Sequence, residues 1–169
     1  MDCNDDCRDF FNIHLFHLHI FQEMKTSQKG INLILSFEGF SSKPYLDSAG
    51  IPTIGYGNTY YPDGKKVTLK DPVISKEKGV ELFASVLPTY EKIVTNKIKM
   101  TLTQNQFDAL VSHTYNTGGS DTLFSLINKK ADSETIKDWF TSRYITAGGK
   151  VLNGLIRRRK AEADLFFEN

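Results

Sequence analysis

The stretch EGFSSKPYLDSAGIPTIGYG, residues 38–57, decides how this chain folds, because the pattern of apolar residues changes within it. Before it, Ile31, Ile34 and Leu35 have helical spacing, and Ser27 is a residue type that caps helix N-termini. Within it, Gly, Pro, Asp and Ser separate short runs such as residues 53–57. We therefore predict a helix that follows Ser27 and stops at Gly39, and then a small antiparallel sheet within residues 41–64.

Helical spacing returns downstream of this stretch. From Ser75 onward, apolar residues recur on one helical face, and Pro88 is expected to kink that helix. Thr103 and Gln106 have the spacing of a capping box. Further signals are a helix end at residues 117–119, a cap at Ser120, a helix after Ser133 and a last helix over residues 155–166. This order predicts an α+β fold with a small antiparallel β lobe, a larger helical lobe and a cleft between them.

The composition is that of one globular domain. The chain has 169 residues, of which 40% are hydrophobic and 24% charged. These values exclude wholesale disorder, a collagen-like repeat and a disulfide scaffold. No apolar run approaches the roughly 18 residues typical of a spanning helix, so we expect no stable membrane insertion.

The first 23 residues differ from the rest. They hold one basic and five acidic side chains, which leaves 20 basic and 15 acidic side chains, a net charge of +5, in residues 24–169. Both cysteines, Cys3 and Cys7, lie here, and their spacing is neither a redox nor a zinc motif. We interpret residues 1–24 as an appendage and residues 25–169 as the folded domain, with Met24 as an alternative start. A signal segment and a metal site at the three histidines of this segment are the alternatives.

Glu38, Asp47 and Thr53 form the strongest candidate site. Glu38 ends an apolar helix, and an apolar neighbourhood disfavours the charged form of a carboxyl, so we expect Glu38 to act as an acid. Asp47 lies in a polar turn, where it should stay ionised. Two carboxyls in contrasting environments suit glycosidic bond cleavage, and the Thr53 hydroxyl can hold a water.

Around these residues the sequence resembles the phage-type lysozymes, or endolysins, of glycoside hydrolase family 24. The resemblance includes the Glu-x8-Asp-x5-Thr spacing of Glu38, Asp47 and Thr53 and the motif at residues 53–57. It continues through residues 102–110, 115–118 and 154–162 and covers about residues 25–168.

This resemblance implies a function and a set of roles. Glu38 would be the general acid, Asp47 the base or electrostatic stabiliser, and Thr53 the group that positions water. The bond cleaved would be the β-1,4 bond between N-acetylmuramic acid and N-acetylglucosamine in bacterial peptidoglycan. The family needs neither a metal nor an organic cofactor. The resemblance further implies a monomer that is made in the host bacterial cytoplasm and reaches the cell wall after release through the membrane.

Other residues have two interpretations each. Tyr56, Gly57 and Asn116 are candidate substrate-binding residues, but Tyr56 can simply pack, Gly57 can serve a tight turn, and Asn116 can serve a helix end. His113 is expected to be a structural, partly buried histidine. At least one of the three consecutive arginines at 157–159 is expected to pair with an internal carboxylate, because successive helical residues point in different directions. Helical spacing places Trp139, Phe140 and Tyr144 in the core.

Three rival functions follow from the same residues. A lytic transglycosylase would cleave the same bond with one Glu, and a wall-binding or structural phage protein would keep the fold without catalysis. The intact set of Glu38, Asp47 and Thr53 argues against both. A nucleic-acid-binding protein would rest only on the charge and the arginine run, and no groove-reading motif is present, so we expect no nucleic-acid partner.

Overall fold

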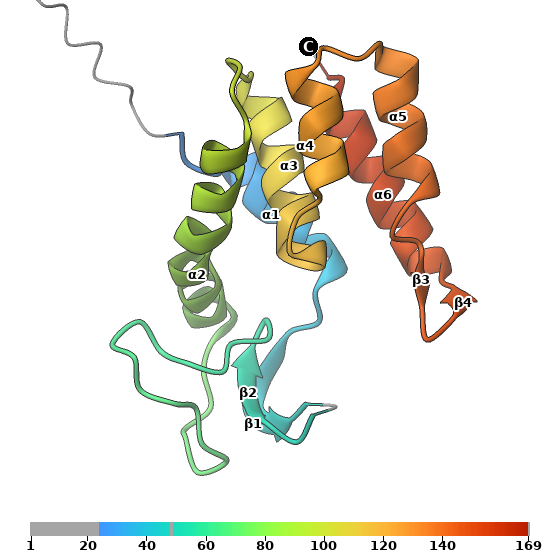
Figure 1. Ribbon diagram of the computed structural model, residues 1–169. Helices are drawn as coiled ribbons and strands as arrows, with labels where there is room; N and C mark the ends of the chain where they lie inside the picture. Colours follow the sequence, from blue (N-terminus) through green and yellow to red (C-terminus); the bar gives the residue numbers. More distant parts are fainter. Residues whose placement is uncertain (1–23, 48, 169) are drawn as a thin grey trace, which may run out of the picture.

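The computed structural model describes residues 24–47 and 49–168, and the predictions made for residues 1–23 lie outside this part. The described residues form six helices and two small antiparallel sheets, so the fold is α+β as predicted (Figure 1). In chain order the elements are α1 (Gln28–Phe37), β1 (Ser41–Leu46), β2 (Pro52–Gly55), α2 (Lys76–Lys97), α3 (Gln104–Thr117), α4 (Asp121–Asn128), α5 (Ser133–Ser142), β3 (Thr146–Ala147), β4 (Lys150–Val151) and α6 (Asn153–Phe166).

The local end signals of the helices are confirmed. Ser27 caps α1 by accepting a hydrogen bond from the Gly30 N–H. Thr103 and Gln106 form both bonds of the predicted capping box at the start of α3. Gly118 ends α3 in the left-handed conformation, at φ +80°. Ser120 caps α4 as predicted. Helix α1 ends one residue earlier than expected, because Glu38 already has extended backbone angles.

The small lobe is built on the β1–β2 hairpin. Its register pairs Tyr45 with Thr53 and Leu46 with Pro52, and the ladder shifts between Ser41 and Tyr45. Ile54, Val67 and Leu82 form a separate small core beneath the strands. Because Leu82 belongs to α2, this core fastens the β lobe to the helical lobe.

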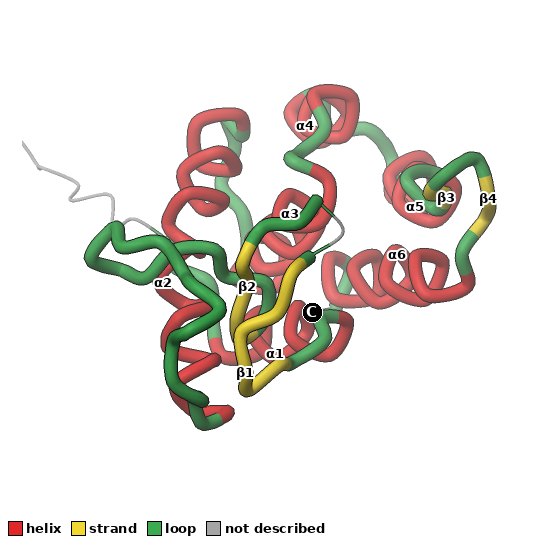
Figure 2. The backbone as a smooth tube through the Cα atoms, turned by 90° about the horizontal axis from the view of Figure 1, so that it is seen from below, coloured by secondary structure: helices red, strands yellow, loops and turns green. Residues whose placement is uncertain are grey.

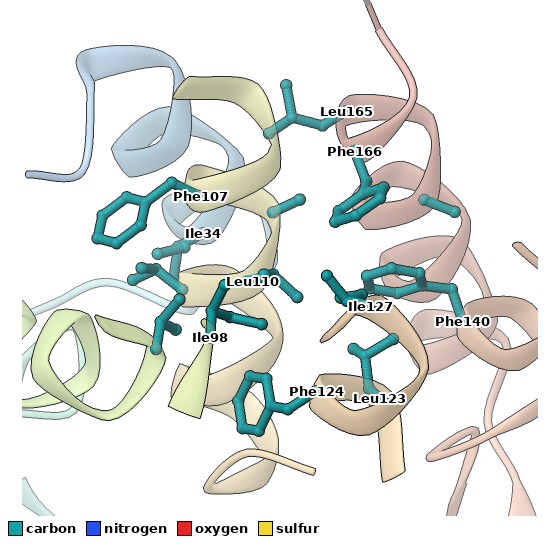
Figure 3. Packing of buried hydrophobic residues seen from close by; sticks show 14 of the residues in the cluster. Ile34, Ile98, Phe107, Leu110, Leu123, Phe124, Ile127, Phe140, Leu165 and Phe166 are labelled. Atoms are coloured by element: carbon teal, nitrogen blue, oxygen red, sulfur yellow. The ribbon is translucent and has the colours of Figure 1, made fainter. Parts of the chain in front are cut away.

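The helical lobe is organised around α3, which packs against α1, α2 and α6. Every residue from 107 to 114 in α3 is buried, which is the arrangement of a helix surrounded by others. Figure 3 shows Ile34 beside Leu110 on one side of α3, and Phe140 near Ile127 and Phe166 on the other side. Such close packing removes apolar surface from water and is the main stabilising term of the lobe.

Two features of the segment after α5 differ from the predictions. Trp139 and Phe140 are buried as expected, but Tyr144 is 44% exposed. Helix α5 ends at Ser142, and Tyr144 has φ +55°, so helical spacing does not apply to it. The β3–β4 hairpin that follows was not predicted. Its turn is Gly148–Gly149, both with positive φ, as a two-residue hairpin turn requires.

Among the described residues, no helix combines the length and apolar character needed to cross a bilayer.

Candidate active site

The three predicted catalytic residues lie where the β lobe joins the helical lobe. Glu38 directly follows α1, Asp47 directly follows β1, and Thr53 lies within β2. The strand register places Asp47 and Thr53 at the same end of the small sheet. Figure 2 shows this sheet, in yellow, beside the end of α1. Within the described chain, no hydrogen bond joins any of these three side chains to another, so each is held by a different set of neighbours.

Glu38 is held by a buried arginine. Its side chain is 23% exposed, and its Oε1 accepts a hydrogen bond of 2.6 Å from Nη1 of Arg158, which is almost fully buried. The Arg158 guanidinium also lies 5.6 Å from the ring centroid of Phe37. The expected apolar neighbourhood of Glu38 is therefore replaced by a cationic partner.

A network of paired charges extends behind Glu38. Glu162 accepts from Arg158 Nε at 3.2 Å and from Ser112 Oγ at 2.7 Å, and its other oxygen lies 3.2 Å from Arg159 Nε. Two guanidinium groups, Arg158 and Arg159, thus share the buried carboxyl group of Glu162. Such pairing is needed because an unpaired charge is very costly in a buried site.

The prediction that at least one of the three arginines pairs internally is confirmed by Arg158 and Arg159, while Arg157 is exposed. The partner Glu162 lies four residues after Arg158 and three after Arg159, on the same helical face. The contact with Glu38 gave no signal in the sequence, because 120 positions separate the two residues.

Asp47 is fixed by the turn that follows it. Its Oδ1 accepts hydrogen bonds of 2.8 Å from the backbone N–H groups of Ala49 and Ile51. Its own backbone N–H donates to the carbonyl of Ile51 at 3.0 Å. No other described group bonds to Oδ2, so one carboxylate oxygen is anchored and the second is available for another partner.

Thr53 is buried, and its hydroxyl donates to the carbonyl of Ile51 at 2.9 Å. The hydroxyl hydrogen is therefore engaged, and the oxygen keeps its capacity to accept a bond. Because Ile51 also donates to Asp47, one turn residue orients both Asp47 and Thr53.

The candidate binding residues differ in what they offer a ligand. The Tyr56 ring is buried against Phe40, with ring centroids 5.2 Å apart, so it serves packing. Gly57 has φ +98°, and open space lies where a Cβ would be. Asn116 is exposed, and its Oδ1 accepts a 2.7 Å bond from Arg159 Nη2. Its amide NH₂ group is the half of the side chain left for other partners.

Tyr115 is a neighbour of the site that the sequence did not point out. Its hydroxyl donates to the backbone carbonyl of Tyr56 at 3.3 Å, which links α3 to the β lobe. Burial, reinforced by the nearby charge of Glu38, raises the pKa of Tyr115 well above its ordinary value. Tyr115 therefore stays a neutral hydrogen-bond donor at any physiological pH.

His113 is fully buried rather than partly buried, and it is structural as predicted. It packs among the rings of Trp139, Phe140 and Tyr144. Its Nδ1 lies 3.3 Å from the hydroxyl of Thr117. Among the described residues, no group of three or more His, Cys, Asp or Glu side chains is placed to hold a metal ion.

A small β lobe, a helical lobe and a carboxyl pair at their junction define the class of lysozyme-like α+β proteins. Residues 35–162 match the family model described as phage lysozyme, and the chain belongs to this family. An endolysin of Bacillus phage B103 is 41% identical over 153 residues, which cover 85% of this chain and 54% of that protein.

Solved structures of lysozyme-like proteins have the same fold as this chain. A mutant of P22 lysozyme is 32% identical, with a TM-score of 0.74 over 86% of this chain and 99% of that one. The muramidase domain of SpmX from Asticaccaulis excentricus is 29% identical, with a TM-score of 0.71 over 86% of this chain and 99% of that one. The chain spans about half the length of the Bacillus phage endolysins it matches, 54% and 55%.

Proposed function

We propose that this protein hydrolyses the β-1,4 bond between N-acetylmuramic acid and N-acetylglucosamine in bacterial peptidoglycan. The observation that carries the proposal is the arrangement of the two carboxyl groups. Glu38 accepts a hydrogen bond from the buried guanidinium of Arg158, and beside it, at the end of the small sheet, Asp47 is anchored through one oxygen only. Membership in the phage lysozyme family and the similarity to a muramidase domain support it.

Glu38 is the general acid of the proposed reaction. Protonation of the leaving oxygen transfers a proton from Glu38 and leaves a negative charge on its carboxylate. Arg158, bonded to Oε1, is placed to stabilise that charge as it develops. The same contact leaves Oε2 as the oxygen that carries the proton toward substrate. Arg158 thus acts through Glu38 and is a positioning residue.

Asp47 and Thr53 assist the attack of water on the sugar. With Oδ1 of Asp47 held by two backbone N–H groups, Oδ2 can accept a proton from water or face the positive charge of an oxocarbenium-like sugar. The Thr53 hydroxyl oxygen accepts a hydrogen bond from that water, since the hydroxyl hydrogen is already donated to the carbonyl of Ile51.

Substrate binding involves backbone and amide groups. Gly57 lets a sugar approach the main chain, because no side chain occupies the space beside it. Tyr56 supports this segment through its buried ring. Asn116 donates from its amide NH₂ group, whose orientation is set by the bond to Arg159.

The proposed setting is the lysis of a bacterial host. The protein, as a monomer without a cofactor, is made in the host cytoplasm and acts on the wall after release through the membrane. Residues 25–169 form the catalytic domain, and residues 1–24 are an appendage. The domain start is supported by Thr26, whose N–H and hydroxyl donate to Glu91 of α2 at 2.7 and 2.8 Å.

The deciding experiment compares the protein with its Glu38→Gln variant on purified peptidoglycan, with products analysed by mass and reducing ends. New reducing ends that disappear in the variant are expected. Glu134→Gln, an exposed glutamate on α5, is the matched control and should keep full activity. Anhydro-muramic ends would instead identify a lytic transglycosylase, and binding without cleavage by folded protein would identify a wall-binding protein.

A further inference from the structure

The β3–β4 hairpin and the residues around it expose an unusual combination of side chains. We call this the hairpin surface and define it as residues 143–152 with Ile156 and Arg157. Val151 is 59% exposed, and Tyr144, Leu152 and Ile156 are also among the exposed large hydrophobic residues of the protein. A cluster of exposed apolar side chains within one short segment is typical of a binding surface.

The hairpin surface is also strongly basic. Residues 139–161 contain six Arg and Lys side chains and no Asp or Glu. Arg158 and Arg159 are buried against Glu162, and Lys160 pairs with Asp164 at 2.8 Å.

The other three cations have no such partner among residues 24–47 and 49–168. The side chains of Arg143, Lys150 and Arg157 are exposed, and within the described part of the chain none of them makes a hydrogen bond or an ion pair. Three cations without local carboxylates create a positive field that attracts and orients an anionic ligand.

The hairpin surface lies close to the proposed catalytic acid. Helix α6 starts at Asn153, directly after β4, and its Arg158 holds Glu38. At a rise of about 1.5 Å per residue, Asn153 and Arg158 are separated by roughly 7.5 Å along the helix. In both views the end of α1 lies between the β1–β2 sheet and the hairpin (Figures 1 and 2).

We propose that the hairpin surface binds the carboxylate-bearing peptide stems of the peptidoglycan strand whose glycan occupies the active site. The inference rests on the proposed function. The glycan backbone offers hydroxyl and amide groups, whereas the stems carry free carboxylates beside small apolar side chains. Arg143, Lys150 and Arg157 meet the carboxylates, since guanidinium and carboxylate groups form paired hydrogen bonds. Tyr144 and Val151 cover the apolar parts.

The test is a binding and cleavage comparison on two substrates. One is intact peptidoglycan, and the other is the same glycan strands freed of peptide by an amidase, with the lactyl carboxylates that this cleavage leaves on muramic acid converted to neutral amides. The variant combines Arg143→Gln, Lys150→Gln and Arg157→Gln. The control combines Lys92→Gln, Lys129→Gln and Lys137→Gln, exposed lysines elsewhere that give the same change in net charge. Sedimentation at low salt measures binding, and reducing ends measure initial rates.

The hairpin variant should lose at least about tenfold in binding to intact peptidoglycan and match the native protein on freed glycan. The control should match the native protein on both, and a variant with Arg143→Lys and Arg157→Lys should keep most of the binding. An equal loss on freed glycan, or no loss at all, would overturn the proposal. So would a loss seen only with walls that carry phosphate polymers. Binding is read separately from cleavage, so failure of the hydrolase proposal would be visible as binding without reducing ends.

Discussion

Arg158 donates a 2.6 Å hydrogen bond to the carboxylate of Glu38 and, through Nε, a 3.2 Å bond to Glu162. One buried guanidinium therefore holds the proposed catalytic acid and the centre of a buried charge network at the same time. Helix α6, near the end of the described chain, in this way determines the position of a residue that follows the first helix. The activity and the stability of the helical lobe are expected to depend on the same side chain.

Arg158→Lys tests this relationship. Lysine keeps the charge but not the fork of N–H donors, so it cannot bond to Glu38 and Glu162 in the same geometry. We expect kcat on peptidoglycan to fall roughly 10- to 100-fold with KM little changed, because Arg158 acts through Glu38 on the transition state. Lys137→Arg, an equally conservative change at an exposed position of α5, should leave kcat unchanged. A kcat equal to that of the native protein in Arg158→Lys would show that the acid needs no such support.

Glu162→Gln tests the buried network. The substitution removes the buried carboxylate that pairs with both Arg158 and Arg159. Breaking a buried ion pair from one side costs about 3–5 kcal/mol, so the free energy of unfolding in urea should fall by that order. Asp164→Asn, which removes an exposed partner of Lys160, should change it by less than about 1 kcal/mol. Equal effects of the two substitutions would contradict the role of the network.

His113 predicts a pH dependence of stability. Burial, and then the charges of Arg159 and Arg158, lower the pKa of His113 from 6.5 to about 3. Between these values the unfolded chain binds a proton that the folded chain does not, so acid favours unfolding. The free energy of unfolding should therefore decrease as the pH falls from 6.5 toward 3, by up to about 1.4 kcal/mol per pH unit from this group.

The measurement is urea unfolding of the native protein and of His113→Gln between pH 4 and 7. The variant should lack this share of the slope, although it is less stable at pH 7 because the buried imidazole packs among three rings. Identical slopes in the two proteins would show that His113 does not cause the acid sensitivity.

Gly79→Ala tests how the β lobe is seated on α2. A Cβ at Gly79 would lie 2.5 Å from Cε2 of Phe40, the residue just before β1. The Phe40 ring must move, and with it the strand that leads to Asp47. We expect a loss of about 1–3 kcal/mol in stability, typical of overpacking, together with reduced activity.

Gly154→Ala is the matched control for Gly79→Ala. Gly154 lies in α6, and nothing surrounds the position of its missing Cβ. Alanine there should leave stability unchanged or raise it by up to about 1 kcal/mol, since glycine is a poor helix residue. Thermal unfolding and the release of reducing ends are measured for both variants. They decide whether the close contact between Gly79 and the Phe40 ring fixes the position of the β lobe on α2.

Local signals allowed much of this protein to be predicted. Ser27, Thr103 and Ser120 cap helices because each side chain bonds to a backbone N–H three residues away. Turn residues between short apolar runs predicted the β1–β2 hairpin, because turns are also set by local hydrogen bonds such as those from Ala49 and Ile51 to Asp47. The spacing of Glu38, Asp47 and Thr53 is likewise visible in the chain, and the match of residues 35–162 confirms the family that this spacing indicated.

What the tertiary structure alone decided is which groups meet across long separations. No local pattern places Arg158 on Glu38 or Asn116 on Arg159, because these contacts depend on how α6 packs against α1 and α3. The exposure of Tyr144 likewise depends on where α5 ends. The sequence determined the helices and strands, because short-range hydrogen bonds control where they begin and end. It also showed which side chains are able to take part in a reaction. Packing determined their environment, which turned the expected apolar setting of Glu38 into a charged one.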